Sequence, residues 1–304
     1  MNLLFILLFL FSLQPQSSAN GVEDPALSAK IEGLFQTVLT TDDESEEALA
    51  IAQAKSIYTE QGLSTVSEIG DLPAYEFVVL LASEKLSLEF RTQVLAKVKG
   101  AAARRDIPSD AATFYETRLR LDKVKEEAKT HPPTKPDLRD ELDRMFKSDQ
   151  AVRQQEGFDP DKMAEIDHQN SAPLQAILDK FGVPTFLMVG SQAAGEFVTM
   201  IQHQPAQFRQ QVLPQLKASV AAGQADPQSY ALVYDRSQRD VGKNQLYGEN
   251  LECKAGEKLH EAPIEDESHV NQRRAELGLI RMELYVRLVQ KTMPQLCTPT
   301  EMKK

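Results

Sequence analysis

The 304-residue sequence contains no tryptophan, only two cysteines, and no long apolar run after residue 13. A transmembrane helix needs about 20 consecutive apolar residues, so we expect no membrane span downstream of that run. The sequence also lacks a Gly-x-Ser-x-Gly elbow, a Walker loop, a His-Glu-x-x-His motif and a cysteine pair at zinc spacing. These absences argue against the common hydrolase, nucleotide-binding and zinc-binding classes. We therefore predict no cofactor and no metal site.

Positive charge is also scarce, with 34 Lys and Arg against 45 Asp and Glu and a net charge of -11. Binding to nucleic-acid phosphates draws on a basic face, and no part of the sequence supplies one. The charges of both signs are interspersed, which favours solubility rather than a charged partner. We predict that the chain does not bind nucleic acid.

Residues 1–19 have the features of a cleavable signal peptide. Leu3 to Leu13 form an uncharged apolar run of about 11 residues, which is too short to cross a bilayer. Ser17 and Ala19 place small residues three and one before the Ala19–Asn20 bond, as suits signal peptidase. No cysteine follows this run to carry a lipid anchor. We expect an exported protein, either periplasmic or secreted.

Export bears on the two cysteines, Cys253 and Cys297, because disulfides persist in oxidising compartments. A bond between them would tie the C-terminal tail, residues 293–304, to the region around Cys253. The alternative is a pair of unpaired thiols.

The spacing of apolar residues predicts a mainly α fold. Apolar side chains recur every three or four residues, as on helices that bury one face. Helices are predicted around residues 31–38, 49–57, 73–85, 87–104, 109–129, 138–155, 160–180, 191–203, 206–222 and 227–239. We expect Ser109 and Asp110 to cap the helix that follows Pro108.

A proline cluster divides the chain into two parts. Because prolines cannot continue a helix, residues 131–137 are predicted to link a helical unit at 20–130 to a C-terminal domain at 138–292. Two short alternating runs around a glycine-containing turn predict a β-hairpin at about 244–264. A last helix is expected from about Val270 to Thr292.

The two parts share an internal duplication. Seven residues recur at a constant offset of 120: Gly62, Thr65, Gly70, Ala74, Glu76, Phe77 and Val78 match Gly182, Thr185, Gly190, Ala194, Glu196, Phe197 and Val198. After a two-residue slip the offset becomes 118, and Phe90, Arg91, Gln93, Val94, Leu95, Lys99, Ala103 and Arg118 match Phe208, Arg209, Gln211, Val212, Leu213, Lys217, Ala221 and Arg236. Chance similarity between amphipathic helices is the alternative, and the matched glycines make it the weaker explanation. We interpret the halves as duplicated multi-helix units, of which the second also carries the hairpin and the last helix.

The duplication separates shared structure from possible function. Residues common to both copies are explained by packing and caps, whereas residues found only in the second copy need another reason. Gln202 and His203 stand opposite Ala82 and Ser83, Asp235 stands opposite Thr117, and Asp149, Gln150 and Arg153 stand opposite Val38, Leu39 and Asp42. Gln245 and Tyr247, in the hairpin, have no counterpart in the first copy. We expect any function to reside in the second copy.

These second-copy residues also carry a resemblance to a known family. The ordered motifs are Asp149-Gln150-x-x-Arg153, Asp167-x-x-Asn170, Phe181-Gly182-x-Pro184, Val189-Gly190, Gln202-His203, Leu213-Pro214, Asp235-Arg236, Gly242-x-x-Gln245-x-Tyr247-Gly248, Pro263-Ile264-Glu265-Asp266 and Arg273-Arg274-x-x-x-Gly278-Leu279. Over residues 138–290 the chain resembles an uncharacterised bacterial family, domain of unknown function six-six-two-four. It departs from the family's usual pattern at Val183, Gln204, Glu249 and Asn250, where Trp, Ala, Thr and Gln are usual. The resemblance implies no reaction.

The chemistry of these residues allows several roles. His203 follows a helix C-terminus, a position that favours the protonated imidazole, and Asp235 could orient it as a general base. We therefore assign His203 and Asp235 as candidate catalytic residues. The candidate ligand-binding residues are Gln202, Arg236, Gln245, Tyr247, Asp149 and Arg153.

Three competing interpretations stay open. Arg236 could clamp an anion or pair with Asp235, and the whole polar set could be a structural network that fixes how the hairpin docks. Asp167, His168, His203 and Asp235 could hold a metal only if the fold brings them together. Arg273 and Arg274 are expected at a solvated helix end. The leading hypothesis is an exported module that binds a small polar or anionic ligand and could hydrolyse it. The alternative is a non-enzymatic helical interaction protein whose partner is another envelope protein.

Overall fold

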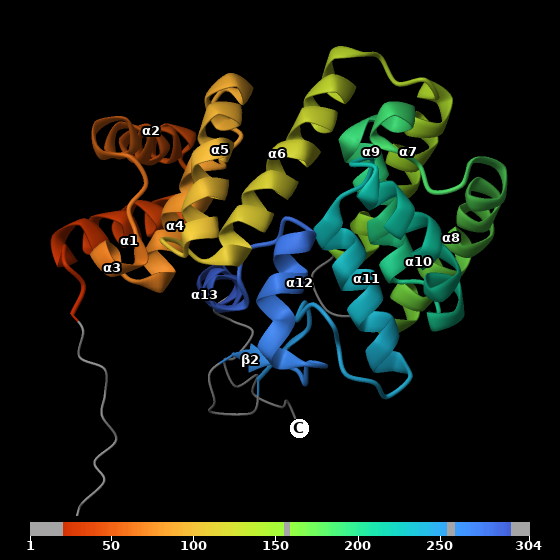
Figure 1. The fold of residues 1–304 in the computed structure, drawn as a ribbon. Coiled ribbons are helices and arrows are strands. Elements are labelled where there is room, and N and C mark those ends of the chain that lie inside the picture. Colours follow the sequence, from red (N-terminus) through yellow and green to blue (C-terminus); the bar gives the residue numbers. More distant parts are fainter. Residues whose placement is uncertain (1–20, 155–158, 254–258, 293–304) are drawn as a thin grey trace, which may run out of the picture.

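The computed structural model describes residues 21–154, 159–253 and 259–292. The predicted signal peptide, Cys297 and the C-terminal tail lie outside these residues. Eleven helices in sequence order form most of the fold (Figure 1): α1 (Pro25–Thr40), α2 (Glu44–Gln61), α3 (Val66–Ile69), α4 (Asp71–Leu81), α5 (Leu88–Arg104), α6 (Ser109–Thr130), α7 (Pro136–Arg153), α8 (Pro160–Phe181), α9 (Phe186–Gln202), α10 (Ala206–Ala221) and α11 (Pro227–Asp240). A C-terminal segment follows, with β1 (Leu251–Glu252), β2 (His260–Glu261), the 3-10 helix η1 (Glu267–His269), α12 (Val270–Glu276) and α13 (Met282–Thr292). The prediction of a mainly α fold is confirmed.

Local chemistry explains where many of these helices begin. The side chains of Asp24, Asp43 and Asp226 accept hydrogen bonds from backbone N–H groups in the first turns of α1, α2 and α11. Such caps satisfy donors that have no partner inside the helix. Proline occupies an early position of α7 and α8, where its missing N–H costs nothing. The predicted cap of α6 is wrong, because Pro108 is the N-cap residue and no side chain caps the helix.

The duplication is visible in the backbone. Gly62 and Gly182 have φ of 84° and 71°, and Gly70 and Gly190 have φ of 93° and 84°. Each pair has the positive φ that favours glycine. Between them, Thr65 and Thr185 both cap the following helix. Gly70 separates α3 from α4, and Gly190 makes the same break inside α9. The first unit, α1 to α6, therefore has the same local geometry as the second unit, α7 to α11.

An ion pair with a buried arginine occurs at the same place in each unit. Arg91 of α5 donates to Asp122 of α6 at 2.6 Å, and Arg209 of α10 pairs with Asp240 of α11. Arg91 also donates to the carbonyl of Ala82, and Arg209 donates to the carbonyl of Gln202. Asp122 and Asp240 are 118 residues apart, as are the two arginines. This ion pair ties the last two helices of a unit to the end of the preceding helix.

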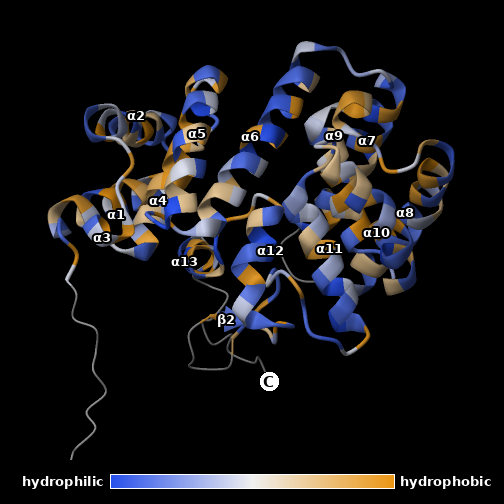
Figure 2. Ribbon diagram, in the orientation of Figure 1, coloured by the Kyte–Doolittle hydropathy of each residue, from blue (hydrophilic) through white to orange (hydrophobic). Residues whose placement is uncertain are grey.

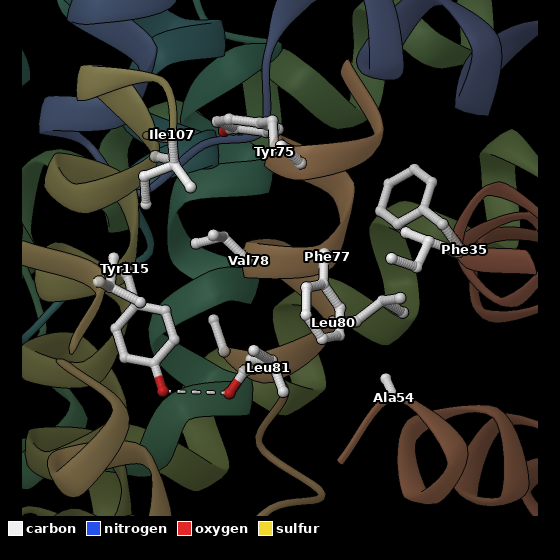
Figure 3. Close-up of a cluster of buried hydrophobic side chains, with 14 of the residues drawn as sticks. Phe35, Ala54, Tyr75, Phe77, Val78, Leu80, Leu81, Ile107 and Tyr115 are labelled. Atoms are coloured by element: carbon white, nitrogen blue, oxygen red, sulfur yellow. Dashed lines mark hydrogen bonds between the residues drawn. The ribbon is translucent and has the colours of Figure 1, made fainter. Parts of the chain in front are cut away.

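Each unit has its own apolar core. The first core gathers residues of α1 to α6, including Phe77, Val78 and Tyr115, whose hydroxyl donates to the carbonyl of Leu81 at 3.2 Å (Figure 3). The second gathers residues of α7 to α11, including Phe197. Figure 2 shows that the helices of both units are amphipathic, with apolar and polar residues on different faces. Among the described residues, no helix is long and apolar enough to cross a membrane.

The C-terminal segment runs back across the first unit (Figure 1). Helix α12 packs on α6, and α13 packs on α1. The Arg281 guanidinium donates to Asp110 at 2.6 Å and to Asp71 at 2.5 Å, and lies over the ring of Tyr75. Leu284 is completely buried in the core of the first unit. The segment therefore joins the two units.

The predicted single helix from Val270 to Thr292 is wrong. Gly278, with φ of 72°, donates to Ala275 and is followed by a hydrogen bond from Leu279 to Arg274. These two bonds are the glycine termination motif that ends helices. A Cβ on Gly278 would lie 3.2 Å from side-chain atoms of α6, so this turn also permits the close approach of α12.

Glu76 in α4 is a buried carboxylate whose negative charge is only weakly balanced by a neighbouring cation. One oxygen lies 3.4 Å from Arg287, the other has no partner among the described residues, and burial raises the pKa of Glu76 to about 7. The folded protein therefore keeps a proton that the unfolded chain releases between about pH 4.5 and 7. Stability falls as the pH rises through this window.

We expect Glu76→Gln to be more stable than the parent at pH 8 by about 1 to 3 kcal/mol. At pH 4.5, where Glu76 is protonated in the fold, the difference should vanish. Urea denaturation at both pH values measures it. A gain of the same size at both would contradict the assignment of this proton to Glu76.

Candidate functional site

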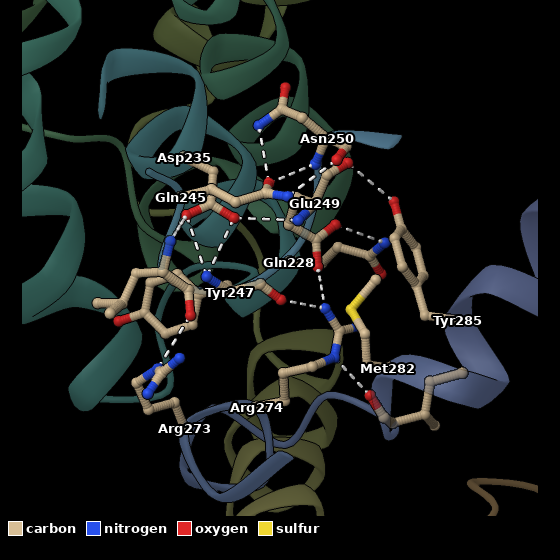
Figure 4. Close-up of polar contacts among 12 residues, drawn as sticks. Gln228, Asp235, Gln245, Tyr247, Glu249, Asn250, Arg273, Arg274, Met282 and Tyr285 are labelled. Atoms are coloured by element: carbon tan, nitrogen blue, oxygen red, sulfur yellow. Dashed lines mark hydrogen bonds and ion pairs between the residues drawn. The ribbon is translucent and has the colours of Figure 1, made fainter. Parts of the chain in front are cut away.

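Asp235 of α11 holds the loop at residues 244–250 (Figure 4). Its completely buried carboxylate accepts hydrogen bonds from the backbone N–H groups of Leu246 at 2.7 Å, Tyr247 at 3.1 Å and Glu249 at 3.0 Å. Burial raises the pKa of Asp235, and these three backbone bonds oppose the rise. The carboxylate thus acts on the loop backbone and not on His203.

Gln245 is also used within the loop. Its buried amide nitrogen donates to the carbonyls of Asn250 at 2.9 Å and Ala262 at 2.7 Å, and its oxygen accepts from the Asn250 backbone at 2.9 Å. The Gln245 side chain therefore takes the place of the backbone hydrogen bonds that join the two strands of a regular hairpin. The predicted hairpin is reduced to the antiparallel pair β1 and β2, and Gln245 forms an isolated parallel bridge with Ile264.

Tyr247 packs among aromatic rings. Its ring centroid lies 5.9 Å from that of Tyr230 and 5.6 Å from that of Tyr234, both on α11. The predicted hairpin strand does not form at Tyr247, since residues 246–250 form no strand. The backbone N–H groups that a strand would use are bound to Asp235.

A buried ion pair that was not predicted completes this network. Arg274 is 1 % exposed and donates to Glu249 at 2.9 Å, to the Tyr247 carbonyl at 2.6 Å and to the Ile280 carbonyl at 2.6 Å (Figure 4). The expectation that Arg274 is solvated is therefore wrong. The adjacent Arg273 also binds backbone carbonyls, among them that of Leu246 at 2.9 Å. The break at Gly278 turns this part of the chain inward, which the sequence pattern of a continuous helix did not indicate.

The remaining predicted residues meet at a different place, at the ends of α7 and α9. We call Asp149, Arg153, Asp167, His203 and Arg236 the His203 site. Their side chains come from α7, α8, α11 and the C-cap of α9. The structure thus divides the predicted site into a loop-holding network around Asp235 and a separate His203 site.

Asp149 and Arg153 form the base of the His203 site. The completely buried Asp149 carboxylate accepts from the Arg153 guanidinium at 2.9 and 3.0 Å and from Asn170 at 3.4 Å. Arg153 also pairs with Asp167 of α8, whose side chain is 24 % exposed. The motifs around Asp149 and Asp167 therefore contribute to the same ion-pair network, in which Arg153 binds both carboxylates. Asp167 and Asn170 were not among the predicted site residues, although both stood in the quoted motifs.

His203 lies against this network. Burial lowers the pKa of His203, the charges of Arg153 and Arg236 act in the same direction, and Asp149 and Asp167 act against it. The expectation that the helix C-terminus and Asp235 favour the protonated ring is wrong, because burial and two guanidinium groups dominate. Within the described residues, the His203 ring makes no hydrogen bond. The site thus presents a neutral imidazole at neutral pH.

Two neighbours of His203 complete the geometry. The backbone carbonyl of Gln202 accepts from Arg209 at 3.3 Å. The 1 % exposed side chain of Gln204 donates to the Asp167 carbonyl at 3.1 Å, and its oxygen has no partner among the described residues. Arg236 is exposed and makes no ion pair with any of the described residues. It does not pair with Asp235, which points into the loop.

Metal binding finds no support in this geometry. Within residues 21–154, 159–253 and 259–292, no group of three or more His, Cys, Asp or Glu side chains is placed to hold a metal ion. The disulfide between Cys253 and Cys297 stays a prediction, because Cys297 lies outside the described residues.

Comparison with known proteins identifies a family for the second unit and the C-terminal segment. No curated protein and no solved structure matches the chain. A family model described as a family of unknown function, DUF6624, matches residues 136–295. The match spans both the His203 site and the Asp235 network, and covers slightly more than half of the chain. The chain therefore belongs to the DUF6624 family.

Proposed function

We propose that the chain binds a small polar or anionic ligand at the His203 site. The observation that carries the proposal is a half-buried imidazole without a hydrogen bond, set beside two guanidinium groups at a position where the first unit has a serine. Partly buried groups with perturbed pKa values cluster at functional sites, and burial lowers the pKa of His203.

The charges of the site favour an anion. Arg153 is shared between two carboxylates, while Arg236 lies at the surface without a carboxylate partner among the described side chains. A guanidinium binds a carboxylate or phosphate through two parallel hydrogen bonds. The ring of His203 can donate one further hydrogen bond to the same anion.

A hydrolytic role uses the same arrangement. A neutral His203 can take a proton from water, and Arg236 can stabilise the negative charge that develops on the substrate. Asp235 has no part in this reaction, because its oxygens are bound to backbone N–H groups. The proton-accepting role therefore falls to His203, since Asp149 and Asp167 are both paired with Arg153.

The double variant Gln202→Ala with His203→Ser tests whether the site is structural. These are the residues of the first unit, and no hydrogen bond of the described chain depends on the two side chains. We expect the free energy of unfolding at pH 7 to change by less than about 0.5 kcal/mol. A loss above about 2 kcal/mol would assign the residues to a structural network.

The pH dependence of the same variant has a definite sign. The unfolded chain protonates His203 near pH 6.5, whereas the folded chain does so only at a lower pH. The parent therefore loses stability as the pH falls below 6.5. The double variant should lose less, so its stability relative to the parent should rise between pH 7 and 5.

Binding is tested with inorganic phosphate and citrate in calorimetric titrations. We expect Arg236→Gln to weaken the binding of at least one anion tenfold or more, and the affinity of the parent to rise below pH 6.5 as His203 gains its proton. Arg239→Gln is the matched control, because it removes the same charge from the same helix at a residue that pairs with Glu252. Equal affinities in parent, Arg236→Gln and Arg239→Gln would favour the alternative of an interaction protein.

A further inference from the structure

The first unit has counterparts of four of the five residues of the His203 site, and of Gln202, around one cavity, whereas Asp42, the counterpart of Arg153, does not line it. The residues that correspond to Asp149, Asp167, Gln202, His203 and Arg236 are Val38, Glu47, Ala82, Ser83 and Arg118. All five line one cavity of about 300 Å³ between the first unit and the C-terminal segment. The duplication has thus produced two equivalent positions with different chemistry.

The cavity is walled mainly by apolar side chains. The first unit contributes Phe35, Ile51, Val79, Leu80 and Phe114, and the C-terminal segment contributes Leu279, Ile280 and Leu288. Pockets with apolar walls and a few polar groups are the usual form of small-molecule sites. Because α12 and α13 cover this position, it can admit a small molecule but not a folded partner.

The charges around the cavity leave a positive surplus at Arg118. Asp122 is shared between Arg91, at 2.6 Å, and Arg118, at 3.7 Å, so one carboxylate faces two guanidinium groups. The two acidic lining residues are each paired with lysine: Glu47 lies 3.0 Å from Lys85, and Glu84 lies 3.5 Å from Lys125.

Two further polar groups face the same cavity. Arg274 and Tyr285 both line it, and the guanidinium lies 4.7 Å from the centre of the tyrosine ring. Arg274 is neutralised by Glu249. Arg118, which is 35 % exposed, faces Asp122 and Glu84, and each of these carboxylates also faces another cation, so the cluster keeps a positive surplus at Arg118.

We propose that this cavity is a second ligand site, which binds a small amphipathic carboxylate. The apolar walls take the hydrocarbon part, and Arg118 takes the carboxylate. A cavity of about 150 Å³ holds benzene, so about 300 Å³ suits a ligand of roughly twelve non-hydrogen atoms. Decanoate has this size.

Titration of the purified protein with decanoate, followed by calorimetry, tests the proposal. We expect one decanoate per chain, and at least tenfold weaker binding by Val79→Phe, which fills the cavity from a partly exposed position. The control is Thr59→Phe, which faces a different cavity that shares no lining residue with this one and should leave the affinity unchanged. Ser83→Phe fills the cavity from another wall and replaces Val79→Phe if that variant does not melt cooperatively.

The carboxylate is tested separately. Arg118→Gln should weaken decanoate binding about tenfold and leave the binding of decan-1-ol unchanged. No decanoate binding, or equal binding by the parent and both cavity-filling variants, would overturn the site. Equal binding of decanoate and decan-1-ol by the parent would overturn the assigned ligand class. None of these variants alters the His203 site, so the outcome is independent of the anion experiment above.

Discussion

Asp235→Ala is expected to lower the free energy of unfolding by about 3 to 5 kcal/mol. The substitution leaves three buried backbone N–H groups, those of Leu246, Tyr247 and Glu249, without their acceptor. Each unsatisfied buried donor costs about 1 to 3 kcal/mol, and partial relaxation of the loop keeps the total below the sum. Urea denaturation at pH 7 measures the loss.

Asp235→Thr is the informative companion variant, because Thr117 occupies this position in the first unit. That unit has no loop to hold, so threonine is sufficient there. In the second unit, one hydroxyl can accept only part of what the carboxylate accepts, and we expect an intermediate loss. A loss below about 1 kcal/mol for both variants would mean that the loop keeps its shape without Asp235, and would return this residue to the list of functional candidates.

Local features of this fold could be predicted from the sequence. The start of α8 follows from Pro160, whose fixed φ suits a first helical turn, whereas Pro136, which we placed in the linker, begins α7. The repeated glycines indicated the duplication, and both copies have positive φ at Gly70 and Gly190. Such features depend on a few neighbouring residues, which the sequence displays directly.

Features that depend on distant pairs could not be predicted. Arg281 binds Asp110, 171 residues earlier in the chain, and nothing in either local pattern indicates the other. The break at Gly278 was missed for a related reason, since a single glycine inside a helical pattern is often tolerated. Its role becomes clear only when α12 is seen against α6.

Comparing the two copies identified residues of the candidate site but not their roles. That comparison selected residues special to the second unit, but it could not tell why each is special. Asp235 differs from its counterpart Thr117 because it binds the backbone of a loop that the first unit lacks. His203 differs from its counterpart Ser83 although its ring binds no added segment. Only the partners of each side chain in the fold make this distinction.

Arg274→Met is expected to cost about 3 to 5 kcal/mol, because it leaves Glu249 buried without its partner. Glu249 is 5 % exposed, and burial already raises its pKa even with the guanidinium 2.9 Å away. Without Arg274 the carboxyl must take up a proton to stay buried, so the loss should grow as the pH rises from 6 to 8. Denaturation at several pH values measures both effects.

The control and the rescue follow from the same geometry. Arg273→Met removes an adjacent guanidinium that also binds backbone carbonyls but has no buried carboxylate partner, and should cost only about 1 to 2 kcal/mol. Combining Arg274→Met with Glu249→Gln should recover part of the loss, because no buried charge is then left unpaired. If the double variant is as unstable as Arg274→Met, the arginine acts through the Tyr247 and Ile280 carbonyls. The join between the two units would then depend on its hydrogen bonds to the backbone and not on its charge.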